Sequence, residues 1–101
     1  MVLSEQFDPV AVAKGGSGNE MRAQRAAFLL SRLTPRQLHV LTGMADGLLN
    51  KQIAAFLEID EKTVKMHRAN VLRRLGVTHS AQAVRIAVEA SFAEPPVPVG
   101  H

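Results

Sequence analysis

Apolar residues in the middle of the chain recur at the three- and four-residue spacing of helices, and turn signals divide them into segments. The first segment starts at Thr34, an N-cap residue that is followed by Pro35 and by Gln37, which completes a capping box. Gly47 marks its end. The pattern predicts a helix with one apolar face made of Leu38, Leu41, Thr42, Ala45 and Leu48.

Two further helices follow, separated by a short turn. The first begins at Asn50 and directs an apolar face inward through Ile53, Ala54 and Leu57. Glu58-Ile59-Asp60 interrupts this pattern as a turn of three residues. Asp60 then caps a longer helix that runs to about Leu75 and stops at Gly76, which suits the left-handed conformation.

Helices are also predicted at the two ends of this unit. A fourth helix begins at Thr78 or Ser80 and extends to Ser91, with an apolar set of Ala83, Val84, Ala87 and Val88. At the other end, Asn19 can cap a leading helix over residues 20–33. Its apolar residues are loosely clustered: Met21, Ala27, Phe28, Leu30 and Leu33.

The order of these elements indicates the fold class. A short helix, a tight turn and a longer basic helix are the sequence form of a helix-turn-helix, and no segment has a convincing strand pattern. We therefore expect an all-α, four-helix helix-turn-helix bundle preceded by a linker helix. The domain is predicted over residues 20–92, between a flexible N-terminal tail (1–19), which is rich in glycine near its end, and a flexible Pro-rich tail (93–101).

Composition restricts the class of protein. The 101 residues suffice for about one domain, and 47% hydrophobic with 21% charged residues is ordinary for a globular chain. No cysteine is present, which excludes thiolate zinc sites and cysteine nucleophiles. The longest apolar run, at residues 26–30, is too short for a membrane span, and Glu5 and Asp8 interrupt any secretory signal. We expect a cytoplasmic protein with no membrane partner.

Positive charge concentrates on the third helix. The net charge is +3, and the stretch from Lys62 to Arg74 holds five lysines and arginines but no acidic residue. In helical projection, Val64, Val71 and Leu75 share one side with His67 and Arg68, and the opposite side carries Lys62, Lys65, Met66, Ala69 and Arg73. Cations around small or apolar groups are typical of a face that reads DNA. From charge alone, a merely solubilising face remains an alternative.

Four motifs together carry a family resemblance: Leu33-Thr34-Pro35-Arg36-Gln37, Asn50-Lys51-Gln52-Ile53-Ala54, Thr63-Val64-Lys65-Met66-His67 and Leu75-Gly76-Val77. In this order and spacing, residues 33–88 resemble the LuxR/FixJ/NarL-type (GerE-like) helix-turn-helix output domain. The resemblance implies a DNA-binding domain of a bacterial transcription regulator that dimerises largely through its fourth helix. The helix at 20–33 is similar to the linker between receiver and output domains in FixJ-like response regulators.

The resemblance also implies roles for single residues. Lys65, Met66 and Ala69 match groove-facing positions, Lys51 and Thr63 match phosphate contacts, and Asn50 begins the scaffold helix. With the helical projection, the predicted base-facing set is Lys62, Lys65, Met66, Ala69 and Arg73. The predicted phosphate set is Asn50, Lys51, Thr63, His67 and Arg68, and the dimer set is Val84, Ala87 and Val88.

The chain departs from the family pattern at three places. Gln52 stands where glutamate is common, Leu48-Leu49 replaces a more polar loop, and Thr78-His79-Ser80-Ala81 lacks a frequent arginine. We expect the first change to alter a packing or capping hydrogen bond and the last to remove one phosphate contact. Neither threatens the fold.

Other chemistry is not indicated. His39, His67 and His79 do not share a ligand spacing, so neither a metal site nor a cofactor is expected. No nucleophile, phosphate-loop or dinucleotide motif occurs, and we predict that the protein is not an enzyme.

Three functions remain open. The favoured one is sequence-specific binding of double-stranded DNA by a transcription regulator, with the helix at about 61–75 in the major groove. The expected partners are DNA and a second copy of the chain in a homodimer, and RNA polymerase or a regulatory protein is a further candidate partner. An alternative is a protein-interaction adaptor or anti-regulator with the same fold. A nonspecific nucleoid or RNA binder is disfavoured because tryptophan and tyrosine are absent and the four phenylalanines lie outside the basic helix.

Overall fold

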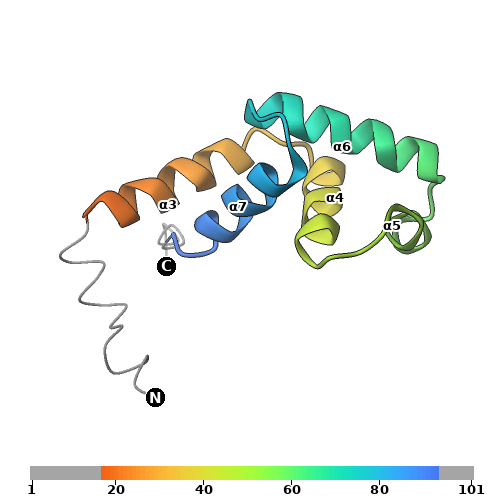
Figure 1. Cartoon of the computed structure of the whole chain (residues 1–101), viewed down its shortest axis with the longest axis horizontal. Coiled ribbons are helices and arrows are strands. Elements are labelled where there is room, and N and C mark those ends of the chain that lie inside the picture. Colours follow the sequence, from red (N-terminus) through yellow and green to blue (C-terminus); the bar gives the residue numbers. More distant parts are fainter. Residues whose placement is uncertain (1–16, 94–101) are drawn as a thin grey trace, which may run out of the picture.

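The computed structural model describes residues 17–93, and this part of the chain is helical without strands. Its elements are α3 (Ser17–Leu30), α4 (Pro35–Ala45), α5 (Asn50–Leu57), α6 (Glu61–Leu75) and α7 (Ser80–Ala90). Helix α3 packs along α7, α4 contacts α6 and α7, and α5 packs against α6 at the other end of the molecule (Figure 1). The all-α prediction is confirmed.

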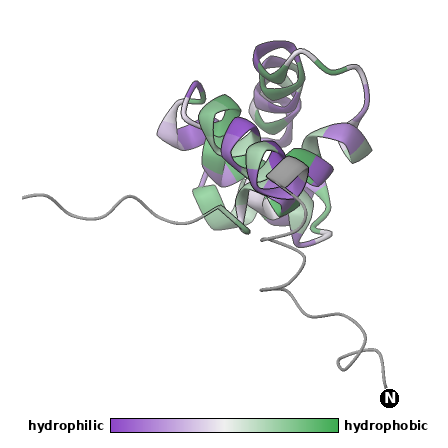
Figure 2. Cartoon of the chain, turned by 90° about the vertical axis from the view of Figure 1, so that its left-hand side faces the viewer, coloured by the Kyte–Doolittle hydropathy of each residue, from purple (hydrophilic) through white to green (hydrophobic). Residues whose placement is uncertain are grey.

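The core lies where α4 to α7 meet. Each helix carries hydrophobic and hydrophilic residues side by side (Figure 2), and the hydrophobic side faces inward. The largest fully buried side chains are Leu41, Ile53, Val40, Val64 and Val71. Met44, Ala54, Leu75 and Ala83 complete the buried cluster. Burial of branched aliphatic side chains from α4, α5 and α6, together with Ala83 of α7, fixes the position of α6 relative to α4 and α5.

Helices α4 and α5 approach each other closely at Gly43. A Cβ atom on this residue would lie 2.8 Å from Cγ1 and 3.0 Å from Cδ1 of Ile53. The absent side chain thus makes room for Ile53, which is only 2% exposed. This contact sets how near α5 lies to the core.

The helix boundaries follow the local signals of the sequence. Thr34 and Gln37 form the reciprocal capping box of α4, with hydrogen bonds of 3.1 and 3.0 Å between side chains and backbone N–H groups. Gly47 and Gly76 follow α4 and α6 with φ angles of +78° and +74°, as left-handed residues after helices. The turn between α5 and α6 consists of residues 58–60 as predicted, and Glu58 also has a positive φ of 57°.

The predicted apolar face of α4 was correct at Leu41, which is buried, and at Leu48, which is half-buried, but wrong at its other three positions. Leu38, Thr42 and Ala45 are exposed, and the buried residues of α4 are Gln37, Val40, Leu41, Gly43 and Met44. Apolar residues occur on several sides of this helix, so more than one stripe fits a helical period. Contacts with α6 and α7 decide which stripe is buried.

The leading helix also differs from its prediction. It begins at Ser17 and ends at Leu30, so Asn19 lies inside the first turn instead of capping it. Met21 and Phe28 are 60% and 65% exposed, whereas Ala23 and Ala26 are buried. Small residues let α3 lie close to α7. Leu30 and Leu33 of the predicted set are half-buried against the core, so the prediction was wrong only for the exposed Met21 and Phe28. The remaining parts of the predicted tails, residues 1–16 and 94–101, lie outside the described residues.

The fourth helix covers the core with part of the predicted dimer set. Ala83 is fully buried, and Val84 and Ala87 are half-buried against the core cluster. Val88 is 48% exposed. Among residues 17–93, no helix is long and apolar enough to cross a membrane.

Candidate nucleic-acid interface

Helix α6 has two opposite faces of different chemistry. Val64, Val71 and Leu75 are buried in the core. All five residues of the predicted base-facing set are exposed: Lys62, Lys65, Met66, Ala69 and Arg73. The fold therefore gathers the predicted set on the free face of one helix, and its contact with DNA stays a prediction.

Asp60 fixes the first turn of α6. Its Oδ1 atom accepts a hydrogen bond from the backbone N–H of Thr63 at 2.6 Å. The Thr63 side chain and then its backbone N–H hold the pKa of the Asp60 carboxyl below its usual value. At neutral pH this carboxylate is ionised and caps the helix, and the half-buried Thr63 side chain is held at the start of α6.

The N-terminus of α5 has free backbone donors. Leu49 precedes the helix, and its N–H group donates to Oε1 of Gln52 at 2.8 Å. Gln52 therefore makes a capping hydrogen bond although glutamate is common at this position. Within residues 17–93, the N–H groups of Asn50 and Lys51 have no acceptor. Together with the exposed Lys51 side chain, they form a positive helix end that suits an anion.

His67 and Arg68 are both half-buried. Nη2 of Arg68 donates to Oγ of Ser80 at 3.1 Å, which ties α6 to the first residue of α7. Nδ1 of His67 is buried and has no hydrogen-bond partner in the described residues, and the same is true of Oδ1 of Asn50. Nε2, the other ring nitrogen of His67, is therefore the one left for a partner outside the chain.

Arg36 connects α4 to the helix-turn-helix. Its Nη1 atom donates to the carbonyl oxygen of Leu57, the last residue of α5, at 3.3 Å. This bond satisfies a helix-end carbonyl and holds α5 beside the start of α4. Sequence reasoning quoted Arg36 only as part of a motif.

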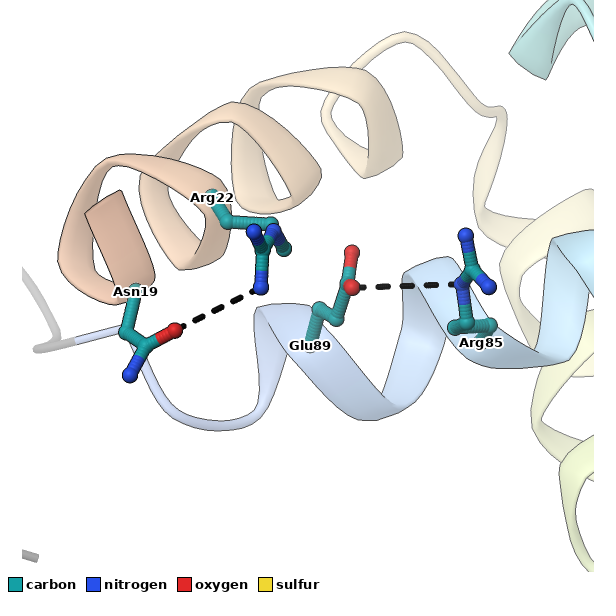
Figure 3. Close-up of polar contacts among 4 residues, drawn as sticks. All are labelled: Asn19, Arg22, Arg85 and Glu89. Atoms are coloured by element: carbon teal, nitrogen blue, oxygen red, sulfur yellow. Dashed lines mark hydrogen bonds and ion pairs between the residues drawn. The ribbon is translucent and has the colours of Figure 1, made fainter.

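The cations of α6 are not neutralised by acidic side chains in the described part of the chain. The ion pair found among residues 17–93 lies on α7, where Arg85 and Glu89 are 4.0 Å apart (Figure 3). The exposed lysines of α6 therefore contribute a positive potential over this helix face.

A second group of basic residues lies beside the C-terminal end of α6. Arg32, Gln37, Asn70, Arg73 and Arg74 line a pocket of about 470 Å³. Sequence reasoning assigned no site role to Arg32, Gln37 or Arg74. Arg32 and Arg74 are 42 positions apart, and only the fold shows that they lie together.

Binding of a metal ion requires a cluster of suitable side chains. Within residues 17–93, no group of three or more histidine, aspartate and glutamate side chains is arranged to hold a metal ion.

The short helix α5, the turn at residues 58–60 and the longer helix α6 packed across it define a helix-turn-helix protein. Residues 31–87 match the luxR family of bacterial regulatory proteins. The chain belongs to this family, whose members are regulators and not enzymes. The resemblance stated from the sequence motifs is confirmed.

Curated relatives match the chain at moderate identity. It is 42% identical over 79 residues to a glycerol metabolism activator of Pseudomonas putida, covering 75% of this chain and 36% of that protein. It is 39% identical over 85 residues to the nitrate/nitrite response regulator protein NarL of Escherichia coli (strain K12), covering 82% and 37%. The transcriptional regulatory protein FixJ of Bradyrhizobium diazoefficiens is 33% identical over 80 residues, covering 79% and 39%. The chain thus spans little more than a third of the length of these relatives.

A solved structure supports the same fold. Full-length FixJ from B. japonicum superposes with a TM-score of 0.71 at 30% sequence identity, covering 84% of this chain and 42% of that one.

Proposed function

We propose that the chain binds double-stranded DNA sequence-specifically as part of a transcription regulator, with α6 in the major groove. One observation carries this proposal: the free face of α6 is basic and holds small or apolar residues at its centre, while the opposite face is buried. Lysine and arginine can donate to guanine O6 and N7, and Met66 and Ala69 suit contact with thymine methyl groups.

Phosphate contacts would hold α6 in the groove. Lys51 and the free N–H groups at the start of α5 can bind one phosphate, and the Thr63 hydroxyl can bind another at the start of α6. Nε2 of His67 makes no hydrogen bond within residues 17–93, so it is available for a phosphate contact. Arg68 already bonds Ser80, and we assign it to phosphate through a remaining guanidinium N–H.

We further propose that two chains bind together through α7. Val84 and Ala87 are partly used by the chain's own core, so Val88 offers the most exposed surface of the predicted dimer set. A patch this small supports only weak association in solution. Two adjacent DNA half-sites would strengthen it because the duplex raises the effective concentration.

The relatives named as response regulators and activators support a role in transcription control, and such a role would locate the protein in the bacterial cytoplasm.

The test is selection of bound fragments from genomic DNA, followed by affinity measurements on the selected duplex and a scrambled one. Lys65→Ala should cost about 1–3 kcal/mol of specific binding, and Lys51→Ala should weaken both duplexes equally and lower the salt slope by about one. Arg25→Ala on α3, an exposed residue distant from α6 in the chain, is the matched control for lost charge. Equal affinity for both duplexes, or a Lys65→Ala protein that binds like the parent, would contradict the proposal; no duplex binding at all would favour the adaptor alternative.

A further inference from the structure

Three arginines meet at the pocket beside the end of α6. Arg73 and Arg74 come from the last turn of α6, and Arg32 comes from the loop between α3 and α4. The two polar side chains that complete the lining are Gln37 and Asn70, and no carboxylate lines the pocket. Its volume of about 470 Å³ lies in the range of small-molecule sites, and all of its lining residues are arginines or side-chain amides.

Hydrogen bonds hold these groups in place. Nη1 of Arg74 donates to the carbonyl oxygen of Arg32 at 2.7 Å, and Nη2 of Arg73 donates to Oδ1 of Asn70. Each of these two guanidinium groups uses one donor for its anchor and keeps others for a ligand. Each bond restricts the motion of its guanidinium group before a ligand arrives, which lowers the entropy cost of binding.

Gln37 adds a neutral donor to the same wall. It is 7% exposed, and its Oε1 atom is occupied by the N–H group of Thr34 at 3.0 Å. This bond fixes the amide plane. The Nε2 group has no acceptor among residues 17–93, so it remains available to the pocket.

The helix dipole does not account for this arrangement. Cations in the last turn of a helix are favourable, which explains Arg73 and Arg74. It does not explain why Arg32 converges on them from another element, because like charges brought together repel. No acidic side chain pairs with any of the three arginines in the described part of the chain.

We propose that this pocket binds a phosphate group. Planar guanidinium groups bind phosphate oxygens through paired N–H donors, and three of them with an amide donor match a doubly charged tetrahedral oxyanion. The bound group would join the loop after α3 to the end of α6, and Arg73 would then contact a phosphate and not the base edge predicted from the sequence. Either a backbone phosphate of DNA or a phosphate ester from solution can supply this chemistry.

Titration of the full chain with inorganic pyrophosphate, without DNA and at constant ionic strength, tests the site. Saturable changes in amide chemical shifts are expected around residues 32–37 and 70–74, together with a rise in Tm. Arg32→Gln removes a guanidinium group but keeps the backbone carbonyl that holds Arg74, and it should weaken pyrophosphate binding by about tenfold or more. Arg25→Gln, an exposed arginine of α3 with the same change in net charge, should leave the affinity unchanged.

Thermal stability separates a ligand site from a structural contact. In phosphate-free buffer, Arg32→Gln should melt at the same temperature as the parent or higher, because one of three like charges is gone. A lower Tm in that buffer would mean that Arg32 acts structurally and would overturn the proposal. Absence of saturable binding, or equal weakening by Arg32→Gln and Arg25→Gln, would also overturn it.

Once that site is established, DNA identifies the source of the phosphate. If the DNA backbone supplies the phosphate, Arg32→Gln lowers duplex affinity and reduces the salt slope by about one. Pyrophosphate then competes with the duplex. If a free phosphate ester supplies it, duplex affinity is unchanged and pyrophosphate still binds the complex. Because the first titration contains no DNA, its result is independent of the proposed function.

Discussion

Replacing Gly43 by alanine tests how tightly α4 and α5 are packed. The new Cβ atom would meet Cγ1 of Ile53 at 2.8 Å and Cδ1 at 3.0 Å. Cγ1 lies in the middle of the side chain, so it cannot move away unless the whole side chain rotates. Ile53 is 2% exposed and enclosed by the core, which leaves little room for that rotation.

Two opposing effects determine the magnitude. Alanine is favoured over glycine inside a helix by about 1 kcal/mol. Overpacking of a core costs about 1–3 kcal/mol. The net expectation is a loss of up to about 2 kcal/mol in the free energy of unfolding, at roughly 4–8 °C of Tm per kcal/mol for a domain of this size. Helix propensity alone predicts the opposite sign.

A double-mutant cycle with Ile53→Ala, followed by urea and thermal unfolding, isolates the contact. Without Cγ1 and Cδ1, Gly43→Ala should stabilise the chain, which gives a coupling energy of about 1–3 kcal/mol between the two positions. An osmolyte such as trimethylamine N-oxide can keep the Ile53→Ala background folded. The matched pair His39→Ala and His39→Gly, at an exposed position of α4, measures the propensity effect separately. The same effect of Gly43→Ala in both backgrounds would refute the packing argument.

Three other expectations concern caps and assembly. The pKa of Asp60 is lower in the folded chain than its ordinary value of 3.8. Its carboxylate therefore stabilises the fold fully at pH values above 3.8, and this contribution is lost as the pH falls through the lower folded-state pKa. Asp60→Asn keeps a neutral cap and should remove that part of the acid dependence in urea unfolding at several pH values; parallel profiles would count against it. Thr34→Ala should cost about 0.5–2 kcal/mol by breaking the capping box, and Thr34→Ser should restore most of it, as denaturant midpoints would report. Val88→Arg should abolish cooperative binding to a two-half-site duplex, so that in sedimentation the second chain joins only at higher protein concentration, and cooperativity equal to that of the parent would exclude Val88 from the contact.

Signals confined to a few neighbouring residues were predictable from the sequence. The capping box at Thr34, the cap at Asp60 and the left-handed Gly76 each depend on local backbone geometry, and the structure confirms all three. The buried side of α6 was also predictable, because Val64, Val71 and Leu75 form one aliphatic stripe, whereas Met66 and Ala69 lie among charged residues on the opposite side. Its exposed set was therefore correctly identified as exposed.

Features that depend on packing between distant segments were not predictable. The face of α4 was misjudged because its apolar residues allow more than one stripe, and the choice of Val40 and Met44 depends on α6 and α7. In α3, the small residues Ala23 and Ala26 pack inward because the helix lies close to α7, whereas hydrophobicity alone favoured larger residues. The phosphate pocket depends on a contact between residues 42 positions apart, which no local pattern reports.

The bond from Arg68 to Ser80 has a consequence for how binding specificity can change. It joins the middle of α6 to the start of α7, and Val71 and Ala83 pack in the same core, so the two helices are linked at the surface and in the interior. If two chains bind DNA through α7 as proposed, the separation of the two α6 helices would be a property of the scaffold, and the bases recognised would depend on exposed side chains such as Lys65. Exchange of those side chains between relatives should alter the sequence of each half-site and preserve the distance between half-sites.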